Sequence, residues 1–70
     1  MGDYVQYAKF IWNKFNEGKS LSDQEVIEGA KALKELAKDL GETFKWQQAA
    51  NEASAMAKRL KAIAKQRGIQ

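Results

Sequence analysis

The chain has 70 residues, a formal net charge of +3, and neither cysteine nor histidine. Its length fits one small domain, and the missing residue types exclude disulfides, thiolate or imidazole metal ligands and the commonest general base of enzymes. No apolar run reaches the roughly 20 residues of a membrane span, and the first residues lack the basic head and apolar body of a signal peptide. We therefore expect a cytoplasmic protein with one domain over residues 1–70, no metal, no cofactor and no membrane partner.

The composition and the spacing of the glycines predict an all-α fold. Proline is absent, and Ala, Leu, Lys, Glu and Gln, which all favour helices, are abundant. Gly18 and Gly41 separate amphipathic segments and Gly68 follows the last one, as glycines commonly do after helix ends. The sequence thus predicts a small three-helix bundle with helices over about residues 3–17, 22–40 and 43–67.

The first predicted helix starts at Asp3, a favourable N-cap residue, and carries most of the aromatic side chains. Its core-facing stripe at helical spacing consists of Tyr4, Val5, Ala8, Ile11, Trp12 and Phe15. Tyr7 and Phe10 lie on a flank of this stripe, with Lys14 beside them. Two interpretations stay open for these three residues: a protein interface, where Tyr and Phe are enriched, or a flank covered by the neighbouring helices.

The second predicted helix has the most specific start signal in the chain. Ser22 and Glu25 have the spacing of a capping box, and Leu21 and Val26 flank it as a hydrophobic staple would. The expected inner stripe is Val26, Gly29, Ala30, Leu33, Leu36, Ala37 and Leu40. The outer face carries Glu28, Lys31, Glu35 and Lys38 at spacings that favour ion pairs. Gly29 inside the helix indicates either close approach of a bulky ring, such as that of Trp12, or no structural role.

The third predicted helix is capped by Thr43 and has a seam of alternating three- and four-residue steps. That seam is Trp46, Ala49, Ala53, Met56, Leu60 and Ile63. Such steps favour close, nearly antiparallel packing of the coiled-coil type. We therefore expect the second and third helices to form an antiparallel pair, with the first helix packed across them.

The positive charge of the chain is concentrated in the third helix. Residues 1–43 carry a net charge of −2, and residues 44–70 carry +5. Opposite the seam, a polar stripe combines lysines with amide and hydroxyl groups suited to phosphates and base edges. This candidate nucleic-acid contact is Gln47, Asn51, Ser54, Lys58, Lys61 and Lys65. The alternative is a solvated face near a helix C-terminus, where the helix dipole favours cations.

Residues 33–41, LKELAKDLG, resemble the first helix and turn of the helix-turn-helix family of DNA-binding motifs. Ala37 matches the mid-helix alanine of that family, and Gly41 matches the glycine that opens its turn. Glu42 and Gln47 depart from the family pattern, which has apolar residues at both positions. The resemblance covers less than half of the motif and implies DNA binding through the third helix.

No nucleophile–base pair and no glycine-rich phosphate loop is recognisable in the sequence, so we do not expect an enzyme. A chain this small, without disulfides or metal, gains stability from surface buried between subunits. We therefore predict a non-enzymatic protein-interaction module, oligomeric, that acts as a small adaptor, inhibitor or regulator. Its partner is another protein or a second copy. A nucleic-acid-binding regulator that uses the third helix is the alternative function.

Overall fold

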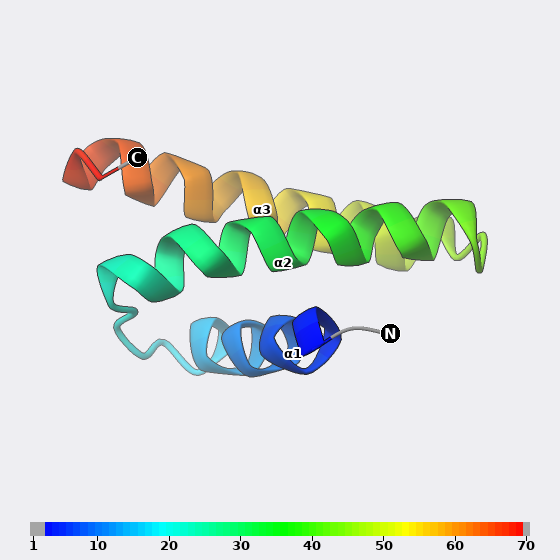
Figure 1. Cartoon of the computed structure of the whole chain (residues 1–70), viewed down its shortest axis with the longest axis horizontal. Helices are drawn as coiled ribbons and strands as arrows, with labels where there is room; N and C mark the ends of the chain where they lie inside the picture. The colour runs from blue at the N-terminus through cyan, green and yellow to red at the C-terminus, as the bar shows by residue number, and fades with distance from the viewer. Residues whose placement is uncertain (1–2, 70) are drawn as a thin grey trace.

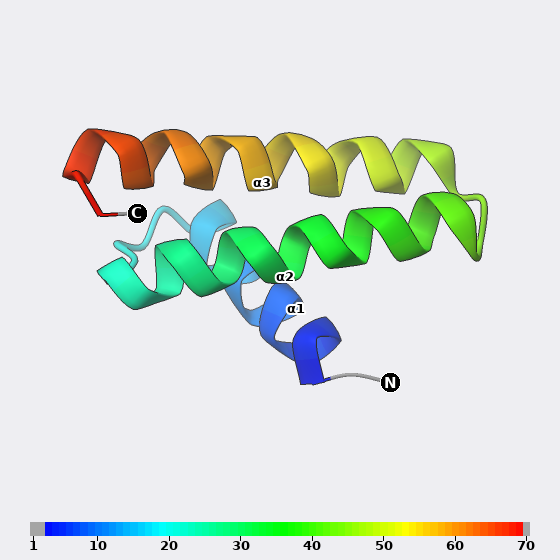
Figure 2. The same cartoon turned by 45° about the horizontal axis from the view of Figure 1, so that its top comes forward.

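The computed structural model describes residues 3–69 and folds them into three helices (Figure 1). These are α1 (Asp3–Asn16), α2 (Asp23–Glu42) and α3 (Gln47–Arg67). Helices α2 and α3 lie side by side in opposite directions, and Figure 2 shows α1 crossing α2 obliquely. The predicted all-α fold, with an α2–α3 pair and α1 packed across it, is confirmed. The predicted capping role of the Asp3 side chain lies outside what the structure describes.

The centre of the core is the point where all three helices meet beside Gly29. Ile11 of α1, Leu33 of α2 and Leu60 of α3 are fully buried. A Cβ atom on Gly29 would lie 2.9 Å from Ile11 Cγ2 and 3.3 Å from Leu60 Cδ1. Glycine is therefore required for α1 to pack this closely, and the side chain that approaches it is Ile11 rather than Trp12.

Helix α2 begins with the predicted capping box. The Glu25 N–H donates to Ser22 Oγ at 3.1 Å, and the Ser22 N–H donates to Glu25 Oε1 at 2.8 Å. Leu21 and Val26, on either side of the box, are both buried in the core. Two otherwise unpaired amides are satisfied in this way, and the start of α2 is anchored to the core.

Two of the three predicted glycine stops are confirmed. Gly18 follows α1 and Gly68 follows α3, and both have left-handed φ angles, of 75° and 73°. After α3, the Gly68 N–H donates to Lys65 O at 3.1 Å and the Ile69 N–H to Ala64 O at 3.0 Å. An equivalent pair of hydrogen bonds closes α1. This arrangement satisfies the last carbonyls of a helix and needs a residue that tolerates positive φ.

The predicted end of the second helix at Gly41 is wrong. Helix α2 continues through Gly41 to Glu42, and Thr43 forms its C-cap, with its N–H donating to Asp39 O at 2.8 Å. The left-handed position in the turn is Lys45, with a φ of 57°. Gly41 does not have a positive φ and does not end the helix. The chain reverses direction at Lys45, four residues later.

The predicted start of the third helix at Thr43 is also wrong. Helix α3 begins at Gln47, and its N-cap position is Trp46, which makes no side-chain capping hydrogen bond. The tight reversal leaves α2 and α3 antiparallel (Figures 1 and 2). The helices of a helix-turn-helix motif cross at about 90–120°. The resemblance to that family therefore does not extend to the geometry.

The buried face of α3 is rotated from the predicted seam. Its buried residues are Ala50, Ala53, Met56, Ala57, Leu60 and Ala64. Trp46 is 59% exposed, so its assignment to the seam is wrong, and Ala49 and Ile63 are only half-buried. Trp46 precedes the first turn of α3, so the helical period does not carry its side chain onto the buried face. The alanines allow the backbones of α2 and α3 to approach closely.

The inner stripe of α2 is buried only in its first part. Leu36, Ala37 and Leu40 are half-buried, whereas Val26 and Leu33 are fully buried. Helix α1 is shorter than α2, and Figure 1 shows no helix beside the part of the α2–α3 pair that is nearest to the turn. That part of the pair therefore buries its apolar residues on one side only.

Candidate interaction surfaces

The structure brings together the three predicted interface residues on α1, which we call the α1 flank: Tyr7, Phe10 and Lys14. The ring centroids of Tyr7 and Phe10 are 6.1 Å apart, and Lys14 Nζ lies 5.5 Å from the centroid of the Phe10 ring. Phe10 is 50% exposed, whereas Tyr7 is half-buried against the core. Only Phe10 of the three therefore presents a large apolar area to solvent.

Lys14 is engaged within the molecule. Its Nζ donates to both carboxylate oxygens of Glu25 at 3.0 Å, which joins α1 to the capping box of α2. The Ser22 backbone N–H and the Lys14 ammonium hold the pKa of Glu25 below its ordinary value. Lys14 therefore positions α1 against α2, and its charge is largely committed to that contact.

Tyr7 borders a hollow of about 470 Å³ between α1 and α2. Glu28 and Glu35 of α2 line the same hollow, and Lys31 is the positively charged residue that lines it. Burial raises the pKa of the Tyr7 phenol, and the nearby carboxylates of Glu25 and Glu28 raise it further. The phenol is therefore neutral at physiological pH and is available as a hydrogen-bond donor.

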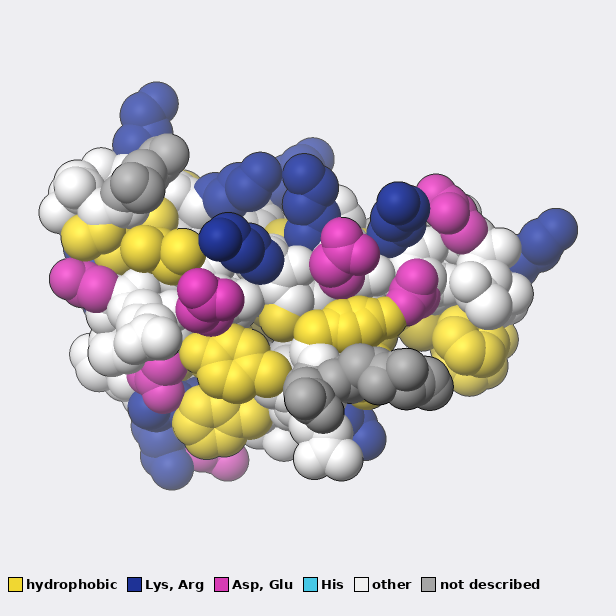
Figure 3. Space-filling view, in the orientation of Figure 1, with side chains coloured by type: hydrophobic (Ala, Val, Ile, Leu, Met, Phe, Trp, Pro, Cys, Tyr) yellow, Lys and Arg dark blue, Asp and Glu magenta, His cyan; other side chains and the backbone are white. Residues whose placement is uncertain are grey.

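A second aromatic surface, which the sequence reasoning missed, lies at the turn between α2 and α3. Phe44 and Trp46 stack with ring centroids 5.1 Å apart and are 55% and 59% exposed. Figure 3 shows hydrophobic side chains at this end of the molecule. We call these two residues the turn surface. No signal in the sequence marks this surface, because the segment from Thr43 to Gln47 contains none of the residues that dominate turns.

The turn surface adjoins the uncovered part of the helix pair. The Trp46 N–H donates to Leu40 O at 2.8 Å, and the Leu40 side chain is itself only half-buried. Adjacent exposed apolar side chains commonly mark sites of protein interaction, and Phe and Trp are enriched at such interfaces. The turn surface is therefore a candidate protein-contact site.

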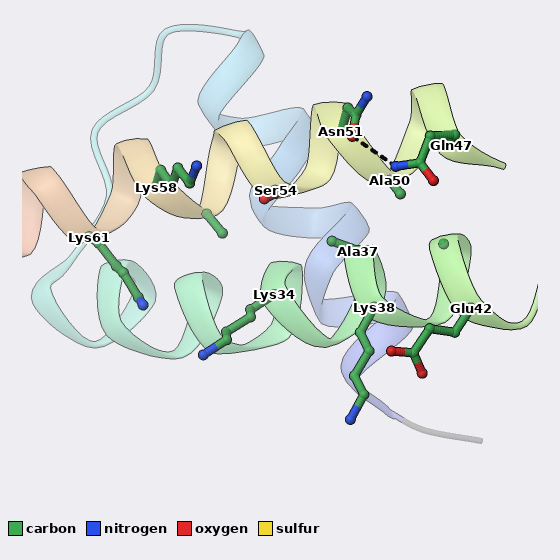
Figure 4. A pocket seen from close by; sticks show the side chains of 12 residues that line it. Lys34, Ala37, Lys38, Glu42, Gln47, Ala50, Asn51, Ser54, Lys58 and Lys61 are labelled. Atoms are coloured by element: carbon green, nitrogen blue, oxygen red, sulfur yellow. Dashed lines mark hydrogen bonds between the residues drawn. The ribbon is translucent and has the colours of Figure 1, made fainter. Parts of the chain in front are cut away.

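A cationic groove of about 520 Å³ runs between α2 and α3, and Figure 4 looks into it. Four lysines line it, two from each helix; we call it the lysine groove. They are Lys34, Lys38, Lys58 and Lys61. The predicted residues Gln47, Asn51 and Ser54 also line it, and Gln47 Nε2 donates to Asn51 Oδ1 at 3.1 Å. Lys65 is not among the lining residues.

The groove lysines have no ion-pair partner among the side chains that the structure describes, those of residues 4–69. The ion pairs of the described chain are Lys14–Glu25, Lys19–Glu17 and Arg67–Asp23. The ion pairs predicted along the outer face of α2 do not form over this range. The sequence reasoning placed Lys38 on that face and did not join it to the stripe of α3, because only the packing of the helices brings the two rows together.

Among the described side chains of residues 4–69, no cluster of three or more potential metal-ligating groups is present. None of the helices in this range is both long enough and apolar enough to cross a membrane. Comparison with known proteins gives no match: the chain matches no protein-family model, no curated protein and no solved structure.

Proposed function

We propose that this protein is a non-enzymatic interaction module that associates with a second copy through its turn surface, and that it acts as a small adaptor, inhibitor or regulator. The observation that carries the proposal is the stacked pair Phe44–Trp46, which leaves more than half of each side chain in solvent. Large aromatic side chains dominate the energetics of protein interfaces when they are buried.

The size of the core supports a second copy as the partner. The largest fully buried side chains are only Ile11, Leu33, Leu60 and Val26. A 70-residue domain with such a core is expected to have low stability on its own. Two-fold contact between turn surfaces, and between the adjoining Leu36 and Leu40, extends the core in the direction that α1 leaves uncovered. A two-fold dimer of this kind is the commonest form of homo-oligomer.

Sedimentation equilibrium of the wild type and two double variants tests the proposal. The variant Phe44→Ser/Trp46→Ser removes the turn surface, and the matched variant Tyr7→Ser/Phe10→Ser removes the aromatic part of the α1 flank. We expect the wild type to sediment with the mass of two or more chains. The turn-surface variant should sediment as a folded monomer, because neither side chain belongs to the buried core.

The comparison between the variants separates two interfaces. Loss of association only in the α1-flank variant would move the interface to Tyr7 and Phe10, as the sequence first suggested. A wild type that stays monomeric up to millimolar concentration would contradict self-association through either surface. Circular dichroism of each variant establishes that the helices remain formed.

A further inference from the structure

We propose that the lysine groove binds the phosphate backbone of nucleic acid. This function is separate from association through the turn surface, because the groove is formed by the facing sides of α2 and α3 rather than by their turn. The packing of α2 against α3 brings two lysines of each helix to one groove, and only the folded chain provides this arrangement.

The charge of the groove is uncompensated over most of its length. None of the four lysines has an ion-pair partner among the described side chains, those of residues 4–69, and Glu42 is the one acidic side chain among the lining residues. Figure 3 shows lysine and arginine side chains gathered along one edge of the molecule. Unpaired ammonium groups in a shallow groove concentrate anions and retain their full charge for an external partner.

The floor and walls of the groove suit a sugar–phosphate chain. Ala37, Ala50 and Ala57 line it, so a ligand can approach the helix backbones closely. Figure 4 shows Lys61 extending from α3 toward α2, and the amides of Gln47 and Asn51 joined by a hydrogen bond. That bond leaves Asn51 Nδ2 free to donate to phosphate oxygens or base acceptors, and Gln47 Oε1 free to accept from a sugar hydroxyl or a base N–H.

The groove is long enough for several phosphates. It extends over residues 47–61 of α3, which corresponds to about 21 Å at the helical rise of about 1.5 Å per residue. Lys34 and Lys61 also line an adjoining hollow of about 420 Å³, which includes Lys31. Phosphates of one DNA strand are spaced about 3.4 Å apart along the helix axis, so a groove of this length can follow several successive phosphates, whereas a single small anion would occupy only part of it.

The composition of the groove favours nucleic acid over a membrane surface. Proteins that lie on anionic membranes insert large apolar side chains beside their cations. The side chains that line the groove with its lysines are instead Gln, Asn, Ser, Glu and Ala. The cations of the groove are all lysines, which bind phosphate as compact point charges. The amide and hydroxyl groups beside them can contact sugars and base edges, which an acidic protein segment lacks, so nucleic acid is the better match.

Fluorescence anisotropy with a labelled 30-base-pair duplex and a labelled 30-nucleotide single strand, over a series of salt concentrations, tests the assignment. The groove variant is Lys34→Gln/Lys38→Gln/Lys58→Gln/Lys61→Gln. The matched control is Lys9→Gln/Lys19→Gln/Lys45→Gln/Arg59→Gln, whose exposed cations do not line the groove. Each variant removes four positive charges and takes the net charge from +3 to −1.

We expect the wild type to bind at least one of the two probes, with an affinity that falls steeply as salt rises. The groove variant should bind at least about tenfold more weakly than the control at the same salt. Its log–log salt slope on the duplex should be flatter by about three to four units, because each lysine–phosphate contact contributes about 0.9. Helical content is checked by circular dichroism, and Lys34→Gln/Lys61→Gln serves as a milder variant.

Several results would overturn the assignment. Equal weakening in the groove variant and the control would show that overall charge, not the groove, binds the probe. If the wild type binds neither probe at the lowest salt, nucleic acid is excluded as the ligand, since low salt favours the binding of nucleic acid to every cationic surface. Displacement of the probe by polyglutamate as readily as by unlabelled DNA would indicate an acidic protein partner. Tighter binding to anionic lipid vesicles than to DNA would indicate a membrane partner.

Discussion

Ile11 packs directly against the backbone of Gly29: a Cβ atom at position 29 would lie 2.9 Å from Ile11 Cγ2 and 3.1 Å from Ile11 Cγ1. Gly29→Ala should therefore destabilise the protein by about 1–3 kcal/mol through overpacking, although alanine favours a helix more than glycine. In an Ile11→Ala background the same change should become neutral or stabilising, because both clashing carbons are gone. Chemical denaturation of the four proteins of this double-mutant cycle measures the effect of Gly29→Ala on stability with and without the Ile11 side chain.

Gly41→Ala is the matched control for Gly29→Ala. A Cβ atom at Gly41 would meet only Ala50 Cβ, at an ordinary 3.6 Å. We expect this variant to be more stable than the wild type by about 0.5–1 kcal/mol, the gain in helix propensity. A loss of stability comparable to that of Gly29→Ala would contradict the helical position of Gly41 within α2.

The turn between α2 and α3 contains the only non-glycine residue with positive φ among residues 3–69, Lys45 at 57°. Lys45→Gly should stabilise the protein by about 0.5–1 kcal/mol, because glycine adopts this conformation without strain. Gln48→Gly, in the exposed first turn of α3, should destabilise it by a similar amount. Thermal unfolding of both variants measures whether each substitution raises or lowers stability. A loss of stability in both variants would show that position 45 is not left-handed in solution.

The capping box makes a prediction for stability at neutral pH. Ser22→Ala removes the acceptor of the Glu25 N–H and should cost about 1 kcal/mol in the free energy of unfolding. Ser20→Ala, at an exposed position before the box, should change it by less than about 0.5 kcal/mol. Equal midpoints for the Ser22 variant and the wild type in urea denaturation would place the start of α2 elsewhere.

The lowered pKa of Glu25 makes a separate prediction for pH dependence. Because the folded-state pKa lies below the unfolded one, the ionised carboxylate stabilises the protein above the unfolded pKa, and this stabilisation is lost as pH falls through the folded value. Glu25→Gln should therefore be less stable than the wild type at pH 7, and the difference should shrink in acid. Unfolding midpoints of both proteins between about pH 7 and pH 2 measure it; a constant difference would contradict the role of charge.

The fold was predictable where local chemistry decides the outcome. The capping box of Ser22 and Glu25 specifies the start of α2 through a few adjacent residues. The left-handed Gly18 and Gly68 specify the ends of α1 and α3 in the same local way. Gly41 and Trp46 were misassigned because a glycine occurs inside some helices as well as after their ends, and an aromatic residue occurs in exposed turns as well as in cores. Only the packing of α2 on α3, with Ala50 near Gly41, decides between these positions.

The candidate sites were predictable only in part, for a related reason. Helical periodicity placed Tyr7 with Phe10, and Lys58 with Lys61, since each pair lies on one helix. The lysine groove also needs Lys34 and Lys38, and no periodicity within one helix shows which residues of another helix will face it. The exposure of Phe44 follows from the length of α1 relative to α2, which leaves the end of the pair uncovered.

The emission of Trp46 in a Trp12→Phe variant tests association through the turn surface most directly, because the chain has two tryptophans and Trp46 is then the single reporter. Its side chain is 59% exposed and stacks on Phe44. As concentration rises from micromolar to millimolar, we predict a shift of the emission to shorter wavelength and reduced quenching by acrylamide, since the indole becomes buried between copies. Emission and quenching that stay constant over this range, as for a solvent-exposed indole, would contradict the proposed interface.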